Sequence, residues 1–96
     1  MNCKTFLMTA AAVLTLGGAA QAETPIKLGV LNDMSSLYAD ISGPGSVVAA
    51  KLAVEDFAKI NPDLKVEVIG ADHQNKPDIG SNIARQWYDR ENVDVI

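Results

Sequence analysis

The sequence predicts an α/β protein built on an open parallel sheet. Short apolar runs alternate with two longer segments of helical periodicity, in the order strand, helix, strand, helix, strand. The runs are almost continuously apolar, which is typical of strands that are covered on both faces. Each helical segment opens at a proline, and polar loops separate the elements.

Residues 1–22 are predicted to be a cleavable signal peptide. Lys4 gives a basic start, residues 5–20 carry no charge, and Ala20-Gln21-Ala22 supplies the small residues expected for cleavage after Ala22. The uncharged run is shorter than the ~20 apolar residues of a membrane span; an uncleaved anchor is the alternative. The sole cysteine, Cys3, lies in this segment. The mature chain is therefore expected to lack disulfides and cysteine metal ligands.

Residues 23–96 are predicted to form the N-terminal part of one domain. Without Lys4 this part has 7 basic and 12 acidic side chains. It has no cluster of Lys or Arg that could neutralise phosphates, so a nucleic-acid partner is not expected. Its last predicted strand would have no covering helix and would present an apolar edge. We therefore expect the sequence to be a fragment, about the first third or less of a longer protein.

The first half of this part contains the most informative loop. A strand is expected over 26–31 and a helix over 44–60, with a broad apolar stripe and Pro44 in its first turn. The connection over 32–43 is polar and long, since strand-to-helix loops usually have two to six residues. Long loops at the carboxyl ends of strands tend to carry function.

The second half repeats the pattern. A strand over 65–69 leads through a polar loop to a helix expected over 77–91. Asn75 and Asp78 have the spacing of a capping box, and Asn92 is a plausible end for the helix. A third strand is expected over 93–96. The helix stripe consists of Ile79, Ile83, Ala84, Trp87 and Tyr88, and its two aromatic side chains are predicted to pack in the core.

The loop after the first strand does not have the pattern of a nucleotide site. Asn32-Asp33-Met34-Ser35-Ser36 stands where a dinucleotide-binding protein has Gly-x-Gly-x-x-Gly, and Gly43-Pro44-Gly45 has the wrong spacing. A Walker loop is absent as well. No cofactor and no metal site are expected.

Two loop carboxylates and a histidine follow the first two strands. In an open parallel sheet the carboxyl ends of adjacent strands border one crevice, so Asp33, Asp72 and His73 are expected to share an edge. They could be acid–base groups or ligands. The alternative, which we favour, is that Asp33 and Asp72 accept hydrogen bonds from nearby backbone N–H groups and that His73 is solvated.

Tyr38 is the most suggestive residue of the first loop. An aromatic body with a hydroxyl tip, placed at the strand ends, suits packing against a small ligand. It could equally close the loop over the edge of the sheet. The pattern alone leaves both interpretations open.

The order of these motifs resembles that of a known family. The segments concerned are 26–31 (Ile-Lys-Leu-Gly-Val-Leu), Asp33-Met34-Ser35-Ser36, Tyr38-Ala39-Asp40, Gly43-Pro44-Gly45, 49–56 (Ala-Ala-Lys-Leu-Ala-Val-Glu-Asp) and 71–77 (Ala-Asp-His-Gln-Asn-Lys-Pro). Together they resemble the substrate-binding proteins of ABC importers, in the type I periplasmic binding protein family typified by the leucine/isoleucine/valine-binding protein. The resemblance covers essentially the whole mature segment.

The resemblance implies a two-lobed periplasmic protein that closes on a small solute and presents it to an inner-membrane ABC permease, without covalent chemistry. The solute would be an amino acid, an amide, or an aromatic or carboxylic acid. In amino-acid-binding relatives the tyrosine of a Tyr-Gly-Asp-like segment lines the cleft, and Tyr38 matches that position. The candidate ligand-binding residues are Tyr38, Ser35, Ser36 and Asp72.

Two other functions remain open from the sequence. The same fold can serve as the ligand-binding sensor module of a receptor, which would carry a transmembrane helix and a signalling domain further along. An exported α/β enzyme would use Asp33, Asp72 and His73 as acid–base groups. Fold class by itself does not decide among these functions.

Overall fold

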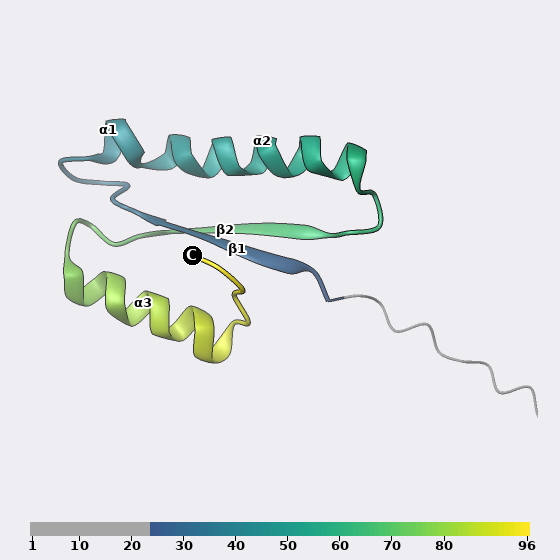
Figure 1. Ribbon diagram of the computed structural model, residues 1–96. Helices are drawn as coiled ribbons and strands as arrows, with labels where there is room; N and C mark the ends of the chain where they lie inside the picture. The colour runs from purple at the N-terminus through teal and green to yellow at the C-terminus, as the bar shows by residue number, and fades with distance from the viewer. Residues whose placement is uncertain (1–23) are drawn as a thin grey trace, which may run out of the picture.

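The computed structural model describes residues 24–96. The predicted signal peptide, residues 1–22, therefore lies outside the described residues. Two parallel strands, β1 (Ile26–Asn32) and β2 (Val66–Asp72), form the sheet. Three helices accompany them: α1 (Ala39–Ser42), α2 (Pro44–Ile60) and α3 (Pro77–Arg90). Figure 1 shows α2 and α3 on opposite sides of the sheet. The open parallel α/β class predicted from the sequence is confirmed.

The register of the sheet brings the carboxyl ends of its strands level. Ile26 pairs with Val66 and Asn32 pairs with Asp72, with no offset between them. Because parallel strands run in the same direction, the loops that follow β1 and β2 begin side by side. This alignment places the residues after both strands at one edge of the sheet.

β1 also has a neighbour on its other side. Leu28 forms a parallel bridge with Val95, the Gly29 N–H donates to the Val95 carbonyl (2.8 Å), and the Asp94 N–H donates to the Lys27 carbonyl (2.9 Å). The third strand expected over 93–96 is thus present only as this bridge. β1 lies between β2 and the end of the chain.

The two long helices agree closely with their predicted spans. α2 begins at Pro44, which has no N–H to leave unsatisfied, and ends where the Asn61 N–H caps the Phe57 carbonyl at 2.9 Å. α3 likewise begins at Pro77. The short helix α1 lies within the stretch 32–43, which was expected to be all loop. It was not predicted because four residues are too few to show a helical periodicity.

The predicted capping box at the start of α3 is wrong. Lys76 is the N-cap residue, and it makes no side-chain cap hydrogen bond. Asn75 instead has a left-handed backbone (φ 56°), as does Gln74 (φ 55°). Asn92, expected to end α3, follows the C-cap Glu91 and is also left-handed (φ 53°), a conformation that asparagine tolerates better than most residues.

Trp87 forms the centre of the packing between α3 and the sheet. Its side chain is only 5% exposed, and it lies directly over Gly29 of β1. A Cβ at Gly29 would come within 2.5 Å of Trp87 Cζ3, so the absent side chain makes room for the indole. Val93 is also buried. Tyr88, predicted to be in the core with Trp87, is 52% exposed, so that half of the prediction is wrong.

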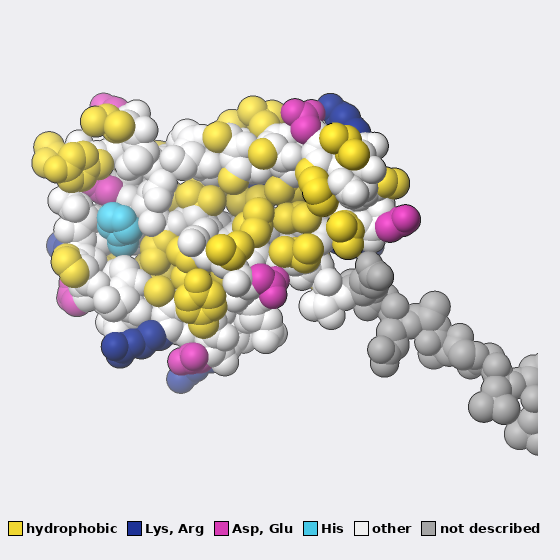
Figure 2. Space-filling model, viewed as in Figure 1, with side chains coloured by type: hydrophobic (Ala, Val, Ile, Leu, Met, Phe, Trp, Pro, Cys, Tyr) yellow, Lys and Arg dark blue, Asp and Glu magenta, His cyan; other side chains and the backbone are white. Residues whose placement is uncertain are grey.

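The opposite face of the sheet is apolar and open beside α2. A groove of about 390 Å³ lies there, and Figure 2 shows yellow side chains gathered over the middle of this view of the molecule. The side chains that line the groove are Ile26, Leu28, Ala50, Ala53, Val54, Phe57 and Val66. None of the helices among the described residues is both long enough and apolar enough to span a bilayer.

Candidate functional site

The loop between β1 and α2 is organised around the carboxylate of Asp33. Asp33 follows the last residue of β1, and its side chain is 1% exposed. Oδ1 accepts hydrogen bonds from the N–H groups of Ser36 (2.9 Å) and Ser35 (3.3 Å). Oδ2 accepts the Ser36 hydroxyl (2.5 Å) and the Tyr38 N–H (2.9 Å). One buried side chain therefore satisfies four donors of the loop that follows it.

These hydrogen bonds favour the ionised form of Asp33. Hydrogen bonds to its carboxylate, of which the one from the Ser36 hydroxyl has the largest effect, lower the pKa of Asp33 from 3.8 to about 2. The backbone N–H groups of Tyr38, Ser36 and Ser35 act in the same direction, and together they outweigh the opposing effect of burial. Asp33 is consequently a carboxylate at neutral pH.

Asp72 performs a similar role from the end of β2. Its Oδ1 accepts the Met34 N–H (2.9 Å) from across the sheet edge and the Gln74 N–H (2.7 Å) of its own loop. The pKa of Asp72 is lowered, with the Ser35 side chain as the largest cause and the hydrogen bond from the Met34 N–H as the second largest. Asp72 thus joins the loops that follow β1 and β2.

Tyr38 lies on the outer side of this loop. It precedes α1 as the N-cap residue, and its side chain is 47% exposed. Its neighbours Leu37 and Ile41 are still more exposed, and Figure 2 shows hydrophobic side chains at the α1 end of the molecule. The loop therefore turns its hydrogen-bond donors inward and the side chains of Leu37, Tyr38 and Ile41 outward.

Two residues that help to close the loop were not anticipated from the sequence. The Asn32 side-chain amide donates to the Ser42 carbonyl, which ties the end of β1 to the end of α1. Gly43 lies so close to the Asp33 carbonyl that a Cβ would be 2.9 Å from that oxygen. The Asn32-Asp33 pair at the end of β1 and the Gly43-Pro44 pair at the start of α2 are the available sequence signals for this closure.

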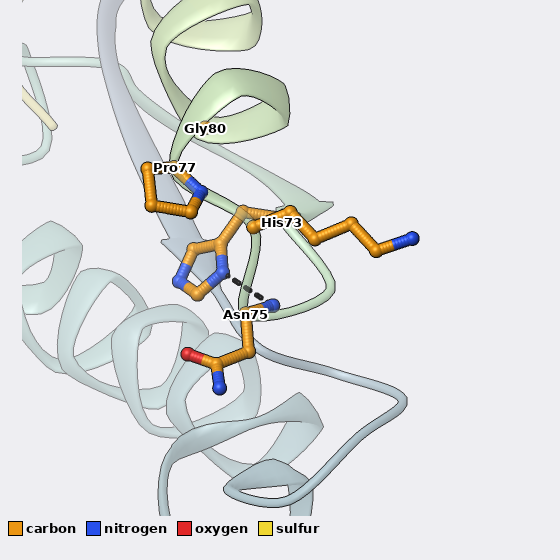
Figure 3. Close-up of a pocket in the computed structure, with 5 residues that line it drawn as sticks. His73, Asn75, Pro77 and Gly80 are labelled. Atoms are coloured by element: carbon orange, nitrogen blue, oxygen red, sulfur yellow. Dashed lines mark hydrogen bonds between the residues drawn. The ribbon is translucent and has the colours of Figure 1, made fainter.

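His73 follows Asp72 in the loop that leads from β2 to α3. Its Nδ1 accepts the Asn75 N–H (3.0 Å), and its backbone N–H donates to the Asn32 carbonyl (2.9 Å). Figure 3 shows the imidazole beside Asn75 and close to Pro77 and Gly80. With Lys76 these residues line a shallow pocket of about 170 Å³. Within residues 24–96 there is no group of three or more His, Cys, Asp or Glu side chains placed to hold a metal ion.

Comparison with known protein families identifies the family to which this chain belongs. Residues 25–96 match the family described as periplasmic binding protein. The chain belongs to this family.

Two solved structures from Burkholderia species are similar to this family member. A periplasmic binding protein from Burkholderia mallei has 47% sequence identity and a TM-score of 0.68, and the match covers 74% of this chain and 19% of that one. A branched-chain amino acid ABC transporter periplasmic ligand-binding protein from Burkholderia xenovorans has 47% identity and a TM-score of 0.67, with the same coverage. The chain thus spans about a fifth of the length of these relatives. A comparison with curated proteins found no match.

The sequence-predicted site residues of this family member fall into one loop region. Ser35, Ser36 and Tyr38 lie within five residues of Asp33, and Asp72 reaches the same loop through Met34. The Ser36 hydroxyl donates to Asp33, and the Ser35 side chain is the largest influence that lowers the pKa of Asp72. Tyr38 is the member of the set whose side chain is turned away from this internal network. His73 belongs to the neighbouring pocket.

Proposed function

We propose that the chain is part of the extracytoplasmic solute-binding component of an ABC importer. The observation that carries the proposal is the 47% identity to a branched-chain amino acid ABC transporter ligand-binding protein over 74% of this chain. The solute would be small and organic: an amino acid, an amide, or an aromatic or carboxylic acid. It would bind at the carboxyl edge of the sheet, between this lobe and a second one.

The mechanism is a closure of two lobes without covalent chemistry. A solute that contacts both lobes stabilises the closed form, and its differential affinity for the two forms sets how far the equilibrium moves. Asp33 and Asp72 support a role without catalysis, because both carboxylates already accept hydrogen bonds from the first loop. The partner would be an inner-membrane ABC permease. The protein would act in the periplasm after cleavage of the signal peptide at Ala22.

Within this proposal Tyr38 is the leading contact residue. Its side chain is half exposed at the sheet edge. Ser35, Ser36 and Asp72 are further candidates. An aromatic ring with a hydroxyl can pack against the apolar part of a solute and also hydrogen-bond to its polar part. We propose that Tyr38 lines the solute cleft.

A thermal-shift screen of the full-length mature protein tests the solute-binding proposal. A solute of the correct class at 100 times its Kd should stabilise the protein by about 2.7 kcal/mol and raise its Tm accordingly. The screen should include branched-chain and other amino acids, short amides, urea and aromatic acids. No stabilisation by any of these classes would contradict the proposal.

The chain offers a matched control for the role of Tyr38. Tyr88 on α3 is exposed to a similar degree (52% against 47%) but lies on the helix that packs against the sheet. Isothermal titration with the solute found in the screen should show weaker binding for Tyr38→Ala, by about tenfold or more for the loss of a packed aromatic ring. Tyr88→Ala should bind like the wild type. Equal affinities of all three proteins would remove Tyr38 from the cleft.

A further inference from the structure

The first loop is held in shape from its interior. The N–H groups of Met34, Ser35, Ser36 and Tyr38 all donate to the carboxylates of Asp33 or Asp72. Three of these four donors, together with the Ser36 hydroxyl, converge on Asp33 alone. A carboxylate that accepts this many bonds from one short segment fixes the direction of each peptide in it.

The two ends of the loop are also joined. The Asn32 side chain donates to the Ser42 carbonyl, and Gly43 packs against the Asp33 carbonyl. Within the loop the N–H groups of Ser42 and Gly43 donate to the carbonyls of Tyr38 and Ala39 at 3.0 Å. The segment is therefore a closed arch whose internal hydrogen bonds need no second lobe and no solute.

Burial separates the residue that shapes the arch from the residues that face outward. Asp33 is 1% exposed, whereas Tyr38 is 47% and Leu37 is 75% exposed. A molecule at the outer surface of the arch can reach the Tyr38 side chain, while the loop itself covers Asp33. Asp33 would therefore not contact such a molecule directly, and the hydrogen bonds of the loop connect it to Tyr38.

We propose that Asp33 is a positioning residue for solute binding, which holds the loop from Met34 to Gly43 in its binding conformation before a solute arrives. The proposal rests on the proposed function. The observed affinity for a solute is the intrinsic affinity multiplied by the fraction of protein whose loop is already in the binding conformation. A loop that is ordered in advance keeps this fraction high and so keeps the affinity high. Tyr38 would then meet the solute without prior ordering of its backbone.

Hydrogen exchange in the solute-free mature protein tests the ordering directly. The amides of Ser35, Ser36 and Tyr38 should be protected in the wild type to the same degree with and without solute. Protection that develops only after solute is added would overturn the proposal, because the solute rather than Asp33 would then order the loop. This measurement needs no variant, and its solute-free part does not depend on the affinity of the protein for any solute.

Asp33→Asn tests the residue itself. The amide has nearly the same shape, but it points an NH₂ group at N–H donors and so disrupts the arch from within. Asp40→Asn is the matched control, because Asp40 lies exposed in α1 of the same segment and loses the same charge. In Asp33→Asn the three loop amides should lose protection while the amides of β1 and α2 keep theirs. Asp40→Asn should match the wild type.

Affinity for the solute found in the thermal-shift screen completes the test. Asp33→Asn should weaken binding by about tenfold or more, since several loop residues must then be ordered at the moment of binding. Unchanged affinity with an unprotected loop, or loss of protection throughout β1, would overturn the positioning role. Failure of the wild type to bind any solute would instead count against the proposed function, while the exchange experiment would still decide whether the loop is ordered in advance.

Discussion

At the scale of single residues, Asp33 makes the stability of the folded protein depend on pH. Its folded-state pKa of about 2 lies below its ordinary value of 3.8, so its ionised form stabilises the folded protein. This contribution is fully present above pH 3.8 and is lost as the pH falls through about 2. The Tm difference between the wild type and Asp33→Asn should therefore narrow between pH 5 and pH 2, as thermal unfolding can show. A gap that stays constant over this range, relative to Asp40→Asn, would contradict the assignment.

Gly29 gives a second prediction at the residue scale. In Gly29→Ala the new Cβ would meet the buried indole of Trp87 at 2.5 Å, so the ring or the strand must shift. Overpacking of this kind should cost about 1–3 kcal/mol of unfolding free energy, measurable by urea denaturation. Gly45→Ala is the control, because a Cβ there has no neighbour within 4 Å and alanine is the better helix former. It should be neutral or stabilise by up to about 1 kcal/mol.

The residue scale is also where the sequence was least informative. Asp33 could be identified as a loop carboxylate, and the interpretation that it binds nearby N–H groups agrees with the structure. Its almost complete burial was not predicted, because the donors come from residues that follow it and the depth of the loop depends on how Asn32 and Gly43 close it. The capping box failed for a related reason: the left-handed backbone at Asn75 places it in a turn rather than at a helix cap.

At the scale of elements, Trp87 is the buried residue of α3 that packs against the sheet. Trp87 is buried against β1, while the adjacent Tyr88 is half exposed. Trp87→Ala should cost about 3–5 kcal/mol of unfolding free energy, because it leaves a cavity next to a glycine that cannot fill it. Tyr88→Ala should change stability by no more than about 0.5 kcal/mol. Urea denaturation followed by circular dichroism measures both, and similar costs for the two variants would argue against this packing.

The long elements were the most predictable part of the fold. Pro44 and Pro77 begin α2 and α3 because proline has no N–H to lose in the first turn of a helix, so both starts could be read directly from the sequence. The apolar runs gave both strands to within three residues at each end. Tyr88 shows what periodicity cannot supply: it adjoins the stripe in sequence, but the width of the buried face is set by the sheet against which α3 packs.

At the scale of the whole molecule, β1 is the central strand. It pairs with β2 on one side and is bonded to Asp94 and Val95 on the other. Central strands open only when the surrounding structure opens, whereas short surface helices open locally. Native-state hydrogen exchange should therefore show the amides of Leu28 to Val30 among the slowest and those of α1 among the fastest. Equal protection of α1 and β1 would contradict this order.

The position of β1 also has a consequence for the time at which the sheet can be completed. The Lys27 N–H is bonded to the Asp94 carboxylate, 67 positions later in the chain. At the usual ~5–20 residues per second of protein synthesis, several seconds separate the emergence of these two partners. β1 is therefore synthesised several seconds before the segment around Asp94 that pairs with its second side. During this interval that side of β1 has no partner from this segment.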